Sequence, residues 1–148
     1  MQQPASTLAV DAAVLVAAAR GRSSGAVLEA SRVATLVTTD RAVQEARRRI
    51  ALGLQRPELL VILDALIDQT TVVPVAALAP MLADCETSLR DAVASRNGSV
   101  SNAYMLALAW CTEADIWTTD RDFAGTGVAT WSTPNLMRGL AAAADEPA

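Results

Sequence analysis

The sequence predicts an α/β fold of three layers, in which helices cover both faces of a mostly parallel central sheet of about five strands. Short apolar runs rich in β-branched residues alternate with longer runs of helix-forming residues. Strands and helices that alternate in this way form parallel sheets covered by helices on both faces. The chain has 148 residues, the usual length of one domain. We expect a single domain over residues 1–143 and a disordered tail over 144–148.

The first expected strand is the apolar run at residues 8–10, which ends at Asp11. Strong helix formers follow at residues 12–20, and Gly21 predicts the end of that helix. A second helix is expected over residues 25–32. The order strand, acid, helix places Asp11 where a parallel strand leads into a helix.

The run at residues 34–38 is rich in β-favouring residues and predicts the second strand. Thr39 or Asp40 is expected to cap the helix that follows, because both residue types accept hydrogen bonds from the first backbone N–H groups of a helix. This helix carries Glu45 and is expected to end at Gly53.

Pro57 suits the first position of a helix, which we expect over residues 57–68. The next strand, over residues 71–75, contains Pro74, and proline cannot donate to a central ladder. We therefore expect an edge strand. The remaining expected elements are helices over 78–95 and 102–112, strands over 115–119 and 128–131, and a closing helix over 134–143.

Composition excludes several kinds of site. The chain has no histidine, and its two cysteines, Cys85 and Cys111, do not have CxxC spacing. These facts exclude an ordinary zinc site and any Ser-His-Asp or Cys-His catalytic centre. The net charge is −4 and all twelve basic residues are arginines. Such a charge argues against a protein that coats nucleic acid non-specifically.

No export signal or membrane span is expected. The apolar residues 8–19 are not preceded by a positive residue and are interrupted by Asp11. The longest uncharged run, residues 69–83, is too short to cross a bilayer and contains two prolines. The cysteines fit a reducing compartment, so we expect a cytoplasmic protein.

Three acids follow the ends of expected strands: Asp11 after one strand, and Asp120 and Asp122 after another. In parallel sheets, functional groups gather beyond the carboxyl ends of the strands. Carboxylates brought together there repel one another, and a divalent cation removes this conflict. Oxygen ligands favour Mg²⁺ or Mn²⁺. The alternative for each acid taken alone is a helix N-cap.

Five stretches of the sequence carry a family resemblance. They are Val-Asp-Ala-Ala-Val-Leu-Val at 10–16, Ala-Val-Gln-Glu-Ala at 42–46, Ala-Leu-Ala at 107–109, Ile-Trp-Thr-Thr-Asp-Arg-Asp-Phe at 116–123, and Gly-Thr-Gly-Val-Ala-Thr-Trp at 125–131. Together they resemble a PIN domain over nearly the whole chain. The resemblance implies a central parallel sheet of about five strands and ribonuclease activity, as in the toxins of bacterial toxin–antitoxin pairs.

The resemblance also implies a set of site residues that share oxygen donors and hold Mg²⁺ or Mn²⁺. They are the catalytic and metal-binding Asp11, Glu45, Asp120 and Asp122, with Thr118 as a supporting hydroxyl. PIN domains usually have a further aspartate, at the place that Asn102 takes here. An asparagine offers a carbonyl oxygen but no charge. A degenerate family member, a neutral metal ligand and a deliberately inactivated chain all fit this substitution.

The expected function is metal-dependent hydrolysis of RNA. The resemblance to toxins of this family implies an antitoxin-like protein inhibitor, and PIN relatives suggest a homodimer. The alternative is a catalytically weakened PIN domain that binds RNA or protein. Arg121 either steers the phosphate or balances the charge of its neighbours. Arg47, Arg48 and Arg49 face three directions, so at most two of them point toward the site of Glu45. The aromatic residues are expected mainly in the core rather than stacked on RNA bases. They are Tyr104, Trp110, Trp117, Phe123 and Trp131.

Overall fold

The computed structural model describes residues 3–21, 24–92, 100–119, 123 and 126–145. Five parallel strands form one sheet, as the sequence predicts, and their order in it is β3-β2-β1-β4-β5. The strands are β1 (Thr7–Val10), β2 (Thr35–Thr39), β3 (Thr71–Val73), β4 (Asp115–Trp117) and β5 (Thr130–Trp131). Leu8 of β1 stands opposite Leu36 on one side and Asp115 on the other. The carboxyl end of β1 therefore lies between the ends of β2 and β4.

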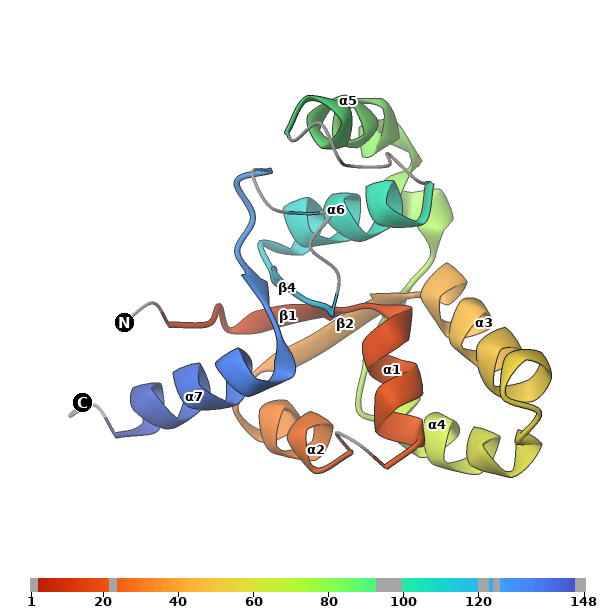
Figure 1. Ribbon diagram of the computed structural model, residues 1–148. Coiled ribbons are helices and arrows are strands. Elements are labelled where there is room, and N and C mark those ends of the chain that lie inside the picture. The colour runs from red at the N-terminus through yellow and green to blue at the C-terminus, as the bar shows by residue number, and fades with distance from the viewer. Residues whose placement is uncertain (1–2, 22–23, 93–99, 120–122, 124–125, 146–148) are drawn as a thin grey trace.

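Seven α-helices surround this sheet and complete the predicted three layers. They are α1 (Ala12–Ala19), α2 (Ser24–Val33), α3 (Asp40–Arg48), α4 (Leu60–Ile67), α5 (Leu82–Ala92), α6 (Val100–Thr112) and α7 (Thr133–Ala144). Helix α6 packs on β1, β2 and β4, and α5 packs on α6 (Figure 1). Helices α1, α2, α4 and α7 lie on the opposite face, with α3 beside α1.

Small and aliphatic side chains fill the space between the layers. Ala103 and Ala107 of α6 are fully buried, and their size lets this helix approach the sheet closely. Trp117, Phe123 and Trp131 are buried, which confirms their expected place in the core. The other two aromatic residues, Tyr104 and Trp110, are only partly buried against that core.

Most element boundaries agree with the sequence, and the differences have local causes. The helix expected over 78–95 begins as a 3-10 helix, Val75–Met81, and α5 starts only at Leu82. Pro80 lies in this 3-10 segment, because proline has no N–H for a helix interior. The helix expected from Pro57 also starts as a 3-10 turn, and α3 continues into a π-helical turn, Arg49–Gly53.

The closing strands are shorter than expected. β4 ends at Trp117 rather than residue 119, and β5 begins at Thr130 rather than residue 128. Helix α7 extends to Ala144, and residues 146–148 of the expected tail lie outside the described residues. In the part of the chain that the structure describes, no helix combines the length and the apolar character that a membrane crossing requires.

Candidate functional site

Asp11 stands directly after the central strand, where the sequence predicts it. Its backbone N–H donates to the carbonyl oxygen of Trp117 at 3.2 Å, so the ends of β1 and β4 are tied together. Its Oδ1 accepts a hydrogen bond from the backbone N–H of Val14 at 2.9 Å. Asp11 is therefore the N-cap of α1, as the capping interpretation predicts.

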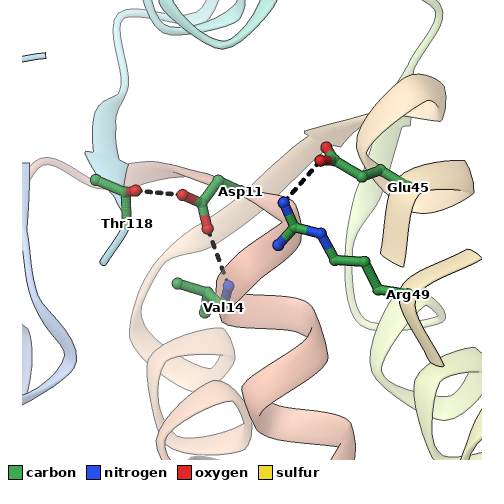
Figure 2. Close-up of polar contacts among 5 residues, drawn as sticks. All are labelled: Asp11, Val14, Glu45, Arg49 and Thr118. Carbon is green, nitrogen blue, oxygen red and sulfur yellow. Dashed lines mark hydrogen bonds and ion pairs between the residues drawn. The ribbon is translucent and has the colours of Figure 1, made fainter. Parts of the chain in front are cut away.

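Capping of α1 does not account for the hydrogen bond that the second oxygen of this carboxylate accepts. Thr118, the first residue after β4, donates its hydroxyl to Asp11 Oδ2 (Figure 2). Thr118 is only 3% exposed, and its backbone N–H donates to Trp131 in β5 at 3.0 Å. The Asp11 carboxylate thus accepts hydrogen bonds from the start of α1 and from the residue after β4. The supporting role in metal binding that the resemblance implies for Thr118 stays a prediction. Each carboxylate oxygen has two lone pairs, so these hydrogen bonds are compatible with a metal ligand.

The end of β2 repeats part of this arrangement on the other side of β1. The Thr38 hydroxyl is fully buried and donates to the carbonyl oxygen of Val10 at 2.7 Å. The next residue, Thr39, caps α3 by accepting from Ala42 N–H at 3.0 Å. Oδ1 of Asp40 accepts a hydrogen bond from the backbone N–H of Val75 at 3.0 Å. This bond joins the start of α3 to the 3-10 helix that follows β3.

These β2 residues were not among the predicted site residues, although the sequence contains a signal for them. The four residues Thr-Thr-Asp-Arg stand at 38–41 and again at 118–121. The first copy begins in the last two residues of β2 and the second begins directly after β4, the two strands that flank β1. The first threonine of each copy donates its hydroxyl to the end of β1 or to Asp11. Their common position relative to β1 becomes visible only once the strand order is known.

Glu45 lies on α3, which packs against α1. Its Oε1 forms an ion pair with Nη2 of Arg49 at 2.8 Å, and the two side chains are 35% and 50% exposed. Figure 2 shows this carboxylate on the side of α3 that faces the start of α1. An exposed pair four residues apart on a helix contributes only about 0.3–0.5 kcal/mol. Glu45 can therefore exchange Arg49 for another cation at little cost.

The neighbouring arginines diverge, as predicted for consecutive helix positions. Arg47 pairs with Asp64 of α4, whereas Arg48 is exposed. Of these three arginines, only Arg49 has a contact with Glu45 among the described residues. The spacing Glu45 to Arg49 is the favourable order for a helical ion pair, and it is the signal by which Arg49 can be found in the sequence.

Asn102 occupies the first turn of α6 and is partly buried. Tyr104, two residues later, carries the guanidinium of Arg41 over its ring at 5.2 Å from the centroid. Because Arg41 is in the first turn of α3, this contact brings the beginnings of α3 and α6 together. The helices that bear Glu45 and Asn102 thus meet at the carboxyl side of the sheet.

Asp120, Arg121 and Asp122 lie outside the described residues. In the sequence, Asp120 follows two positions after Thr118, which contacts Asp11. Within the described residues, no three histidine, cysteine or acidic side chains form a group able to hold a metal. Only two of the four predicted acids belong to this part of the chain, so the four-carboxylate site stays a prediction.

At the carboxyl edge of the sheet, the described residues that could bind a metal are the carboxylate of Asp11, the carboxylate of Glu45 on α3 and the side-chain amide of Asn102 on α6. The chain contains no histidine. Such oxygen donors suit a hard divalent ion, Mg²⁺ or Mn²⁺, better than zinc or copper. The carboxyl edge of a parallel sheet is also where α/β folds bind their ligands. The chemistry of the donors therefore fits the predicted metal.

Comparison with known proteins agrees with this geometry. A protein-family model described as a PIN domain matches residues 9–141, which run from within β1 to within α7. No curated protein matches the chain. The matched region contains every predicted site residue and all five strands except the first two residues of β1. The chain belongs to the PIN domain family.

Proposed function

We propose that this chain is a metal-dependent ribonuclease that hydrolyses RNA phosphodiesters. PIN domains are generally nucleases that use divalent metal ions. The observation that most supports the proposal is the Asp11 carboxylate, which stands at the end of the central strand and is oriented by Thr118 from the end of the next strand. Capping of α1 requires only one of its oxygens.

In this proposal, Mg²⁺ or Mn²⁺ is held by oxygen ligands from four parts of the chain. They are the carboxylates of Asp11, Glu45, Asp120 and Asp122 and the side-chain carbonyl of Asn102. The ion supplies Lewis acidity, which activates water and neutralises charge that develops on the phosphate. The acids also carry the catalytic role, Asp11 and Asp120 as the main ligands and the other two as further ligands or as groups that orient water.

The remaining residues of the site orient these groups. Thr118 and the Val14 N–H keep the Asp11 carboxylate in one orientation, and preorganisation of this kind avoids reorganisation during the reaction. Arg49 balances the charge of Glu45 until a metal replaces it. Arg121 is proposed to steer the phosphate or to balance the charge of Asp120 and Asp122.

A second function, from a different class, is favoured by Asn102. A neutral residue in place of the usual acid lowers the negative charge of the site and weakens its hold on a divalent ion. A PIN domain with a weakened site would bind RNA or a protein without cutting it. Asn102 is therefore the residue that separates the two functions.

The biological setting follows from the same proposal. We propose a cytoplasmic toxin of a toxin–antitoxin pair, held in check by an antitoxin-like protein inhibitor. Both cysteines are free, which suits a reducing compartment. Leu52 in the π-helical turn after α3, and Val61 and Ile62 in α4, are exposed apolar side chains that suit contact with an inhibitor or with a second copy in a homodimer.

The nuclease is tested by incubating the purified chain with single-stranded RNA and Mg²⁺ or Mn²⁺, with EDTA and an Asp11→Asn variant as controls. We expect cleavage that both controls abolish. Asp64→Asn, which removes an exposed acid that pairs with Arg47, should cleave like the unmodified chain. Cleavage that survives EDTA and Asp11→Asn would come from a contaminant and would contradict the proposal. RNA binding without cleavage would support the second function.

A further inference from the structure

Arg41 differs from the other paired arginines of its helix. Arg47 and Arg49 each bind a carboxylate, whereas the Arg41 guanidinium lies over the Tyr104 ring at 5.2 Å. Arg41 is exposed, and within the described residues it forms no ion pair. A guanidinium that lies over an aromatic ring keeps its N–H groups at the edge of its plane, where they can donate to an anion.

The location of this pair is the second observation. Arg41 precedes Glu45 by four residues, so both lie on the same side of α3. Tyr104 follows Asn102 by two residues on α6. The pair therefore bridges the two helices that carry Glu45 and Asn102, at the side of the sheet where Asp11 stands.

The third observation is the repeated Thr-Thr-Asp-Arg sequence. Arg41 is the last residue of the copy at 38–41, and Arg121 is the last residue of the copy at 118–121. From the two sides of β1, Thr38 donates its hydroxyl to the carbonyl oxygen of Val10, and Thr118 donates its hydroxyl to the carboxylate of Asp11. An arginine therefore follows each of the strands that flank the central one.

We propose that Arg41 is a phosphate-binding residue for single-stranded RNA, and that the Tyr104 ring is a positioning residue that holds its guanidinium in place. The inference rests on the proposed RNA substrate and names a residue that binds a phosphate of the RNA backbone. Support from the ring restricts the motion of a long side chain, so less conformational entropy is lost when the phosphate binds. Planar guanidinium groups also match phosphate oxygens with two parallel hydrogen bonds.

The experiment measures binding rather than cleavage. A fluorescently labelled single-stranded RNA is titrated with the full chain in EDTA, by anisotropy, at several salt concentrations. We expect Arg41→Ala to weaken binding about tenfold, as the loss of one charged hydrogen-bonded contact predicts. The slope of log affinity against log salt should decrease by about 0.7, the value for one phosphate contact on a single strand.

Three further variants separate a role in binding from a role in packing. Arg41→Lys should restore the salt slope but only part of the affinity. Tyr104→Phe keeps the ring and should bind RNA normally, whereas Tyr104→Leu removes it and should weaken binding toward the level of Arg41→Ala. Arg32→Ala removes the same charge from the last turn of α2, which precedes β2, whereas Arg41 follows the other end of that strand, and it should leave binding within twofold. Melting curves of all variants confirm that they fold.

The possible outcomes are distinct from those of the nuclease test. If the chain does not bind RNA, or if Arg41→Ala binds as well as the unmodified chain, the inference is wrong. If Tyr104→Leu binds normally, the ring only joins α3 to α6 and its assigned role is wrong. RNA that is bound through Arg41 but not cleaved in Mg²⁺ contradicts the nuclease proposal alone. Cleavage with an unchanged KM in Arg41→Ala overturns this inference alone.

Discussion

Replacement of Thr118 by valine removes one hydroxyl and leaves the shape of the side chain almost unchanged. Thr118 is 3% exposed and donates its hydroxyl to Asp11 Oδ2. A hydrogen bond to a charged group contributes about 1.5–3 kcal/mol. We therefore expect Thr118→Val to lower the free energy of unfolding by about 2 kcal/mol, which corresponds to a decrease in Tm of about 4–8 °C for a chain of this length.

A double-mutant cycle assigns this loss to the contact with Asp11. The free energy of unfolding is measured by urea titration for the unmodified chain, Thr118→Val, Asp11→Ala and the double variant. Loss of the α1 cap occurs in both Asp11 variants and cancels, so the coupling energy reports the interaction between Thr118 and Asp11. We expect a coupling energy of about 1.5 kcal/mol or more.

The matched control is Thr118→Ser, which keeps the hydroxyl and loses one methyl group, at a cost of about 0.8 kcal/mol. Its coupling to Asp11 should stay close to that of threonine. If the coupling energy between Thr118→Val and Asp11→Ala is below about 0.5 kcal/mol, the two substitutions act independently. That result would show that Thr118 does not orient the carboxylate, and it would remove the main support for the site.

Asn102→Asp should tighten Mn²⁺ binding by at least about tenfold in calorimetry, because it adds one negative charge, and unchanged affinity would place Asn102 outside the site. Burial, with a contribution from the Asp84 carboxylate, raises the pKa of the Cys85 thiol from 9.0 to about 11. The folded state then holds a proton that the unfolded chain releases between pH 9 and pH 11, so the free energy of unfolding should fall by about 1.4 kcal/mol per pH unit in that window, and Cys85→Ala should lack this slope. Leu63→Ala, at a fully buried position, should lower the free energy of unfolding by about 2–5 kcal/mol, whereas Val61→Ala, 75% exposed on the same helix, should change it by less than about 0.5 kcal/mol in urea titrations. Glu113 has a φ of 54°, so Glu113→Gly should raise Tm by relieving about 1 kcal/mol of strain, and a lower Tm would contradict this reasoning.

The sequence predicted those elements whose signals are local. Periodicity and end signals located all five strands, and Gly21, with a φ of 88°, follows α1 as expected. Local signals also suggested Thr39 as a cap of α3, which its hydrogen bond to Ala42 confirms. The division of residues 75–92 into a 3-10 helix and α5 was not predicted, since periodicity does not distinguish a 3-10 start from an α-helical one.

The candidate site was predictable only in part, because its contacts join distant segments. The position of Asp11 at the end of a strand follows from the sequence, and its contact with Thr118 depends on the adjacency of β1 and β4. The contact of Arg41 with Tyr104 depends in the same way on how α3 and α6 pack. A single sequence shows which residues can donate or accept, whereas strand order decides which of them meet.

The strand order also sets the sequence in which the site assembles during synthesis. The Thr38 hydroxyl reaches Val10 across 28 residues, whereas the Thr118 hydroxyl reaches Asp11 across 107. Closing the longer loop costs about 1 kcal/mol more in chain entropy, and it has to wait until β4 has left the ribosome. We therefore expect β3, β2 and β1 to associate first, with one side of β1 still unpaired. In a nascent chain of this protein, Asp11 can cap α1 early, whereas its second carboxylate oxygen gains the Thr118 hydroxyl only after β4 has docked, when most of the chain has been translated.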